Sequence, residues 1–301
     1  RHIQNKKSAG QILLVEEPEA HLHPQLQKVL FHSLKSKPVQ TILSSHSTHI
    51  TSSAGLDSMI VLTNSGEPST IATYPSQNDN FLASEIADLE RYLDATRSTL
   101  LYARKVILVE GPAELFLLPP LIKKVLEIDL ERFGVSVIPI YGVHFDVYAK
   151  LFKQSALPKK CAIIADGDLR PSDSFNGQED EEIVVPDLNE LSSEYVGVFR
   201  CKTTFERAIT IPGTLKMLEK TAEEFGAKKT KEMLNECSIV LADASIEDNA
   251  KRNFLSETRQ SVLNTSKRFG KARFAQVASK HVDLATGIPT YIKEAIDWLD
   301  L

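Results

Sequence analysis

The chain has few cysteines, no strong excess of positive charge and no long hydrophobic run. Its 301 residues include three cysteines, Cys161, Cys201 and Cys237. This odd, widely spaced set indicates neither a disulfide framework nor a CxxC zinc site. No apolar run has transmembrane length, and no secretory signal peptide is visible. We therefore expect reduced thiols, a cytoplasmic location and no membrane partner.

The formal net charge of −5 at pH 7 argues against a generally basic coat for nucleic acid. It does not exclude nucleic acid, because catalytic carboxylates contribute to the negative total and are neutralised by bound metal. A length of 301 residues allows two or three domains. The chain opens on Arg1 rather than Met and soon enters an apolar stretch, from which we expect a fragment of a longer polypeptide.

The first eighty residues lack a phosphate-binding GxxxxGK[ST] loop, as does the rest of the chain. They nevertheless contain an apolar run, 11–15, that ends in the acidic pair Glu16-Glu17. An amphipathic segment follows at 25–36, and a second apolar run at 40–43 leads to His46. A carboxylate at a strand end suits a phosphate-bound metal, and a neighbouring one suits a general base.

This arrangement resembles the carboxyl half of an ABC-type ATPase head, of the kind found in SMC-like repair proteins. The resemblance implies that Glu16 binds Mg²⁺, that Glu17 polarises the attacking water and that His46 senses the γ-phosphate. Without the phosphate loop we expect ATP to be bound and hydrolysed only in the full-length protein. The less favoured alternative is a zinc cluster of His21, His23, His46 and His49.

Two acidic strings about fifty residues apart are the most informative part of the sequence. The apolar runs 105–109 and 161–165 predict buried strands of a parallel sheet. Glu110 and Glu114 follow the first run, and Asp166 and Asp168 follow the second. Ligands gather beyond the carboxyl ends of such strands, and four carboxylates there repel one another unless cations neutralise them. The sequence therefore predicts a site for Mg²⁺, Mn²⁺ or Ca²⁺ that acts on phosphodiesters.

The remaining pattern alternates strands and helices. It predicts strands at 69–75, 135–140 and 194–200, and Pro139 indicates that the second lies at a sheet edge or in an irregular position. Helices are predicted at 82–97, at 114–128 with a bend or reset at Pro119-Pro120, at 145–155 and from about 203. The chain from 211 onward should be mostly helical. We divide it into a partial ATPase head (1–80), a linker helix (81–104), a sheet domain (105–210) and a helical subdomain (211–301).

The Glu110-Gly111 strand end and the later Asp166-Gly167-Asp168 resemble the signature of a Toprim domain, the fold shared by topoisomerases, primases and a group of nucleases. The order of head and Toprim domain is similar to that of the OLD (overcoming lysogenization defect) nucleases, relatives of the Gabija defence nuclease. The resemblance implies an α/β fold with a Toprim-type parallel sheet flanked by helices, a helical subdomain and a partial ABC ATPase head.

The resemblance also implies a two-metal nuclease that uses Mg²⁺ or Mn²⁺, with Ca²⁺ as a partly supporting ion. Its metal ligands would be Glu110, Glu114, Asp166 and Asp168. Glu206, which follows the predicted strand at 194–200, is a further candidate, although it equally fits a surface position in a first helical turn.

A lysine near the carboxyl end is the remaining catalytic candidate, beside Glu110 and Asp166. Lys271 precedes Ala272, where the family carries glycine, and could stabilise charge on the reacting phosphate. Arg273, Lys267 and Arg268 are candidate contacts to the DNA backbone, although a solvated basic face explains them as well.

The leading hypothesis is a divalent-metal-dependent DNA endonuclease that nicks and cleaves duplex DNA, coupled in the full-length protein to an ATPase head. The resemblance implies a homodimer, a helicase or defence-system partner, and a role in phage defence or DNA repair. One alternative is a topoisomerase- or primase-like Toprim enzyme, although no tyrosine among Tyr102, Tyr141, Tyr148 and Tyr195 lies in a winged-helix context. The other is a non-catalytic DNA-binding regulatory module of an ATP-driven complex.

Overall fold

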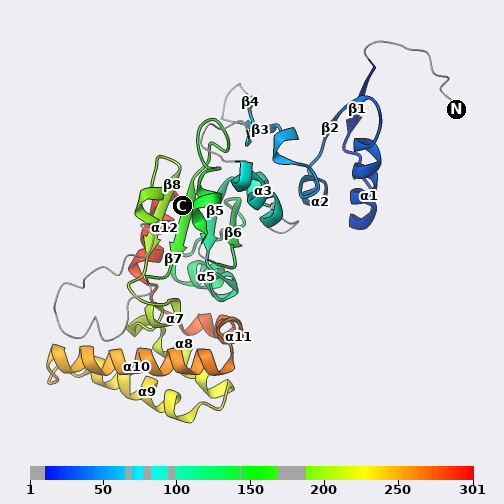
Figure 1. Cartoon of the computed structure of the whole chain (residues 1–301). Helices are drawn as coiled ribbons and strands as arrows, with labels where there is room; N and C mark the ends of the chain where they lie inside the picture. The colour runs from blue at the N-terminus through cyan, green and yellow to red at the C-terminus, as the bar shows by residue number, and fades with distance from the viewer. Residues whose placement is uncertain (1–10, 65–69, 77–82, 94–98, 143, 168–187) are drawn as a thin grey trace. The chain divides into compact units, whose positions relative to one another are not determined.

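The chain folds into an α/β structure made of two compact units, residues 1–102 with 155–157 and residues 103–154 with 158–301 (Figure 1). The computed structural model describes residues 11–64, 70–76, 83–93, 99–142, 144–167 and 188–301. Within these residues no helix is long and apolar enough to cross a membrane. The second unit contains most of the expected Toprim domain, 105–210, apart from residues 155–157, together with the expected helical subdomain. The boundary between these two parts at residue 210 stays a prediction.

The first unit contains two small sheets. β1 and β2 pair in parallel with Glu16 opposite Ser44, and β3 pairs with β4 antiparallel. The strands predicted at 11–15, 40–43 and 69–75 are therefore confirmed. The elements are β1 (Ile12–Glu16), α1 (Pro24–Lys35), β2 (Gln40–Ser44), α2 (Thr48–Thr51), η1 (Leu56–Ser58), β3 (Val61–Asn64), β4 (Thr70–Thr73), α3 (Ala83–Tyr92) and α4 (Thr99–Tyr102).

The second unit is built on a four-stranded parallel sheet in the order β6-β5-β7-β8. The central strands are β5 (Lys105–Val109) and β7 (Cys161–Ala165), and all five residues of β7 are buried. Such continuous apolar runs are typical of strands covered on both faces. The edge strands are β6 (Val135–Pro139) and β8 (Val196–Arg200). Pro139 therefore lies on an edge strand, as predicted, where its missing N–H is tolerated.

The chain after residue 211 is mostly helical, also as predicted. The helices of the second unit are α5 (Pro112–Leu126), α6 (Phe145–Ala149), η2 (Leu188–Leu191), α7 (Phe205–Ala208), η3 (Pro212–Thr214), α8 (Leu215–Glu224), α9 (Lys228–Ala242), α10 (Asp248–Phe269), α11 (Lys271–Ala278), η4 (Ser279–Leu284) and α12 (Thr290–Trp298).

Two helix predictions are wrong in detail. α5 is one helix that continues through Pro119 and Pro120, so the predicted reset does not occur. Its buried side chains, including Leu117, Leu118 and Leu121, pack into the core, and each contributes about 2 kcal/mol of burial, which offsets the lost backbone hydrogen bonds. α6 is also shorter than predicted and ends at Ala149.

One hydrophobic core joins the sheet to the helices that follow it. It contains Val109 of β5, Leu117 of α5, Phe205 of α7, Phe274 of α11 and Ile296 of α12. α11 packs on α5, and α9 lies beside α10 (Figure 1). The start of α11 is therefore held close to the helix that follows β5.

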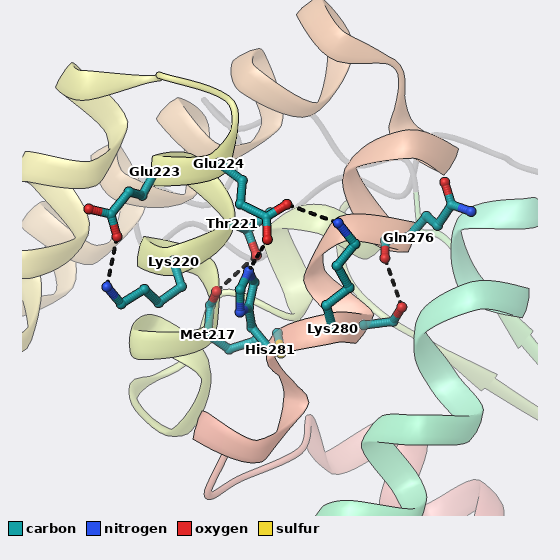
Figure 2. Close-up of polar contacts among 9 residues, drawn as sticks. Met217, Lys220, Thr221, Glu223, Glu224, Gln276, Lys280 and His281 are labelled. Atoms are coloured by element: carbon teal, nitrogen blue, oxygen red, sulfur yellow. Dashed lines mark hydrogen bonds and ion pairs between the residues drawn. The ribbon is translucent and has the colours of Figure 1, made fainter.

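Exposed ion pairs connect α8 to η4 (Figure 2), and a further pair connects α8 to α9. Glu224 accepts hydrogen bonds from Lys280 Nζ at 3.0 Å and His281 Nε2 at 2.9 Å. Lys220 and Lys231 both donate to Glu223, and these hydrogen bonds lower its pKa to about 2. Because both glutamates and the three lysines face solvent, these pairs help to orient the helices and contribute little stability.

Gly167 lies where two backbone segments come together. Its N–H donates to the carbonyl of Thr203 at 2.9 Å. A Cβ at this position would lie 2.6 Å from the carbonyl oxygen of Lys202 and closer still to that of Cys201. Only glycine therefore lets the turn after β7 lie against the segment after β8.

We predict that Gly167→Ala lowers the free energy of unfolding by about 1–3 kcal/mol, because backbone must shift to admit the methyl group. Urea denaturation of the purified chain measures this change. Gly142→Ala is the matched control, since a Cβ at Gly142 meets nothing within 4 Å. Equal stability of the two variants would contradict the close approach.

Candidate active site

The carboxyl ends of β5 and β7 bring Glu110 and Asp166 together. The two strands are neighbours, with Val109 opposite Ile164, and each acidic residue directly follows its strand. The backbone N–H of Asp166 donates to Oε1 of Glu110 at 2.7 Å. The two candidate residues thus lie at one edge of the sheet, as the strand pattern requires.

Glu114 lies in the first turn of α5, above the end of β5. Only 7% of the surface of Glu114 is exposed to solvent. Burial raises the pKa of Glu114 to about 7, and the negative charges of Glu110 and Glu206 contribute to the increase. The carboxyl group therefore lies in a site that disfavours its charged form.

Asp166 has the larger shift. Burial raises the pKa of Asp166 to about 8, helped by the neighbouring carboxylates, while the positive charge of Lys271 opposes the increase. The carboxylates that act on it are those of Glu110, Glu114 and Glu206. Four acidic side chains thus share this edge with one ammonium group.

Glu206 and Lys271 reach the cluster from two different helices. Glu206 follows β8 in α7 and is 2% exposed, so the surface alternative for this residue is wrong. Lys271 Nζ lies 3.1 Å from Glu206 Oε2, and neither carboxylate oxygen accepts a hydrogen bond of good geometry within the described residues. Burial alone would lower the pKa of Lys271, but the carboxylates around it, Glu206 first, raise it above its ordinary value.

The residues present fit a divalent cation in charge and in chemistry. Four carboxylates face one lysine, and the two buried oxygens of Glu206 accept no well-aligned hydrogen bond among the described residues. Hard oxygen donors of this kind suit Mg²⁺, Mn²⁺ or Ca²⁺. Within the described residues, no group of three His, Cys, Asp or Glu side chains is arranged so that it could hold a metal ion. Oε1 of Glu110 accepts a hydrogen bond from the Asp166 N–H.

Two segments of the chain match models of known protein families. Residues 101–168 match the family model for the TOPRIM domain of proteins like the overcoming lysogenization defect protein, and residues 1–51 match that for an AAA ATPase domain. Residues 101–168 are therefore similar to the Toprim domain of OLD-like proteins. The matched segment includes Glu110, Glu114 and Asp166, whereas Glu206 and Lys271 join them only through the fold.

One curated relative is the uncharacterized protein YbjD of Escherichia coli (strain K12), 27% identical over 118 residues. The match covers 39% of this chain and 21% of that protein, so the chain spans about a fifth of the relative's length.

Two solved structures are similar to the chain. The C-terminal region of the Burkholderia pseudomallei OLD protein has 22% identity over 66% of this chain and 97% of that chain, with a TM-score of 0.45. The C-terminal region of the Xanthomonas campestris pv. campestris OLD protein has 27% identity over 67% and 94%, with a TM-score of 0.46.

Of the other predicted Toprim residues, Asp168 lies outside the described residues. Lys267 and Arg268 are exposed in the last turn of α10, and Arg273 is exposed in the first turn of α11, where it donates to Gln276 at 2.7 Å. These three cations therefore flank the Gly270 turn that precedes Lys271. Their contacts to DNA stay predictions.

Sequence reasoning missed two residues of the Toprim site. The thiol of Cys201 lies 3.5 Å from Oδ1 of Asp166 and 3.4 Å from the carbonyl of Thr203. Burial raises the pKa of Tyr291 well above its ordinary value, and the nearby Cys201 and Asp166 raise it further. Cys201 directly follows β8 and Tyr291 lies in the first turn of α12, so no local motif marks either residue.

In the first unit, the predicted ATPase residues Glu17 and His46 lie together. His46 Nε2 is 3.4 Å from Oε1 of Glu17, which has a positive φ of 40°, and Glu16 ends β1. Glu19, which sequence reasoning missed, accepts hydrogen bonds from Ser45 Oγ and the His46 N–H. Burial tends to raise the pKa of Glu19, but these bonds hold it below its ordinary value. The nucleotide roles of Glu16, Glu17 and His46 stay predictions.

The raised pKa of Glu114 predicts how stability depends on pH without metal. An unfolded glutamate ionises near pH 4.5, whereas the folded site resists ionisation until about pH 7. The stabilising contribution of the protonated form is therefore full below about pH 4.5 and is lost as the pH rises through 7. In EDTA at pH 8, Glu114→Gln should raise the free energy of unfolding, on the order of 2 kcal/mol.

Thermal denaturation in EDTA at pH 8 and at pH 5 measures the gain, which should shrink at the lower pH. Glu131→Gln, at an exposed position, is the control and should change neither value. A gain that is equal at both pH values would show that Glu114 is not held against its ionised form.

Proposed function

We propose that this chain is the Toprim part of a divalent-metal-dependent DNA endonuclease that nicks and cleaves duplex DNA by a two-metal mechanism. The observation that supports it is the gathering of Glu110, Glu114, Asp166 and Glu206 around Lys271 at the carboxyl edge of a Toprim-type sheet. Their negative charge exceeds what one lysine neutralises, so the site attracts cations and, through them, phosphate.

The side chains divide into two groups by origin. Glu110 and Glu114 come from β5 and α5, and Asp166 comes from β7, so two adjacent strand ends would hold the metal. Bound Mg²⁺ or Mn²⁺ would supply activation of a water and stabilisation of the leaving 3′-oxygen. Glu206 and Asp168 are the remaining proposed ligands. Ca²⁺, a larger oxygen-seeking ion, would bind and support the reaction only partly.

Lys271 is proposed to stabilise the negative charge that develops on the phosphate. Its side chain is 43% exposed, while its ammonium group lies at the carboxylate cluster. Because its pKa is held above the ordinary value, the group is fully charged at neutral pH. It can therefore face the phosphate oxygens from the solvent side of the cluster.

The rest of the proposal concerns the full-length protein. The AAA ATPase segment supports coupling to ATP, which would be bound only when a phosphate loop completes the head. We propose that the protein acts on DNA in the cytoplasm as a homodimer, together with a helicase or defence-system partner, in phage defence or DNA repair.

A topoisomerase-like reaction is less well supported, because it needs a nucleophilic tyrosine near the metal. Tyr291 is the tyrosine whose titration the cluster perturbs. Burial and the nearby charge of Asp166 raise its pKa well above the ordinary value, so its phenol stays protonated. It therefore suits hydrogen-bond donation better than attack on phosphorus.

We predict that the chain converts supercoiled plasmid to nicked and linear DNA with Mg²⁺ or Mn²⁺, and that Asp166→Asn or Glu110→Gln reduces this to background. Each change removes a negative charge that the metal ions require. Agarose gel electrophoresis over a series of metal concentrations measures the rates, with Glu131→Gln as control. Full activity of Asp166→Asn, or a covalent protein–DNA adduct, would contradict the proposal.

We predict that Lys271→Met lowers the cleavage rate about 100-fold while the protein still binds Mn²⁺, because the lysine acts on the phosphate rather than on the metal. Single-turnover cleavage gives the rate, and Mn²⁺ titration followed by electron paramagnetic resonance gives the affinity. Lys293→Met, at an exposed position of α12, is the matched control. A variant that loses Mn²⁺ binding and cleavage equally would assign Lys271 to the metal site instead.

A further inference from the structure

A groove lies between the start of α9 and the second half of α10. Its volume is about 480 Å³, and its lining includes three cations, Lys228, Lys229 and Arg268, against one carboxylate, Glu257. All three cations are exposed, and none of them is paired with a carboxylate within the described residues. The groove therefore has an excess of positive charge on a chain whose total charge is −5.

The wall of the groove presents hydrogen-bond donors. Buried Arg207 donates from Nη1 to Oε1 of Gln260 at 2.8 Å, and Gln260 Nε2 donates to Oδ1 of Asn264 at 2.9 Å. Gln260 and Asn264 both line the groove. Gln260 keeps one further amide N–H and Asn264 keeps two, and such donors match the acceptor oxygens of phosphate.

The guanidinium group of Arg207, which contacts Gln260 of the groove lining, is buried without an acidic partner among the described residues. Arg207 is 4% exposed, and its Nε donates no hydrogen bond within the described residues. Burial lowers the pKa of Arg207, and the nearby charge of Arg259 lowers it further. Arg259 donates to the carbonyl of Thr210 at 3.0 Å, and neither guanidinium has a carboxylate within 4.0 Å among the described residues. Such uncompensated charge is costly unless an anion approaches it.

The groove is connected to the carboxylate cluster through α7. Glu206 of this helix faces Lys271, while the next residue, Arg207, faces α10. A polyanion whose one phosphate reaches the cluster would meet the cations of the groove with another. Phe269 and Met233 add apolar surface to the lining, which suits the sugars of the strand.

We propose that this α9–α10 groove binds the phosphate backbone of duplex DNA beyond the scissile bond, with Lys228, Lys229 and Arg268 as phosphate contacts and Gln260, backed by Arg207, as a donor. The inference rests on the proposed nuclease function for the identity of its ligand. The groove contributes affinity without base readout, because every contact is to phosphate or sugar.

Binding of a short fluorescein-labelled DNA duplex in EDTA, followed by fluorescence anisotropy over a series of salt concentrations, tests the groove without cleavage. The triple variant Lys228→Ala, Lys229→Ala, Arg268→Ala should weaken binding at least about tenfold and reduce the salt slope by about three, one for each phosphate that the variant no longer neutralises. The control triple variant changes Lys216, Arg252 and Lys293, exposed cations outside the groove, to Ala. An unchanged slope in the groove variant, or an equal loss in the control, would overturn the proposal.

Gln260→Glu provides a second test that does not depend on a loss of stability. The new carboxylate would pair with Arg207 and place a negative charge in the groove wall. We therefore expect an unchanged or higher melting temperature together with weaker DNA binding. Wild-type affinity for the duplex in this variant, or groove-dependent binding of an acidic peptide but not of DNA, would overturn the assignment.

The two proposals fail separately. If the wild-type chain binds duplex DNA through the groove in EDTA but leaves plasmid uncut with Mn²⁺, the nuclease proposal is wrong and the groove stands. If the wild-type chain cuts plasmid while the groove variant binds DNA like wild type, the groove is wrong and the nuclease proposal stands.

Discussion

The repulsion among buried carboxylates at the carboxyl edge of the sheet is the constraint on which the rest of the second unit depends. Glu114 and Asp166 are buried deeply enough that their pKa values rise to about 7 and 8. Folding alone would not place such groups together, because burial penalises each charge and proximity penalises it again. The hydrophobic core beneath the edge supplies the free energy that holds them there, and Lys271 offsets only part of their charge. A site of this kind is stable in its ionised form only when cations share it.

The sheet imposes this convergence through its topology. β5 and β7 are adjacent central strands, so the residues that follow them emerge side by side whatever their own preferences. The turn after β7 then lies against the segment after β8, because Gly167 has no Cβ and its N–H binds the carbonyl of Thr203. That contact brings Cys201 to Asp166 and starts α7 at the position from which Glu206 reaches the cluster. The positions of the carboxylates therefore depend both on the strand order and on the close backbone packing at Gly167.

The sequence predicts the part of this site that local patterns encode. Continuous apolar runs ending in Glu110 and Asp166 are visible without a structure, because central parallel strands cannot alternate with polar residues. Cys201, Tyr291 and Arg207 could not be found in this way, since each becomes relevant only through a contact made by a distant segment. Local sequence patterns also could not predict that α5 continues through Pro119 and Pro120. Burial of the helix against the core outweighs the propensity of proline to end a helix. Local chemistry therefore predicts strand ends, and tertiary packing decides what surrounds them.

Adjacent residues of opposite charge on the one-turn helix α7 show how the packing separates two electrostatic regions. Glu206 and Arg207 are both buried, yet they do not pair with each other; Glu206 turns to Lys271 and Arg207 to Gln260. Consecutive residues of a helix do not face each other, so the two side chains enter different surroundings. This separation leaves negative potential at the sheet edge and positive potential toward α10. The negative region suits the proposed metal cations and the positive region suits the proposed phosphate contacts, so a nucleic acid bound with its metal ions would complement both.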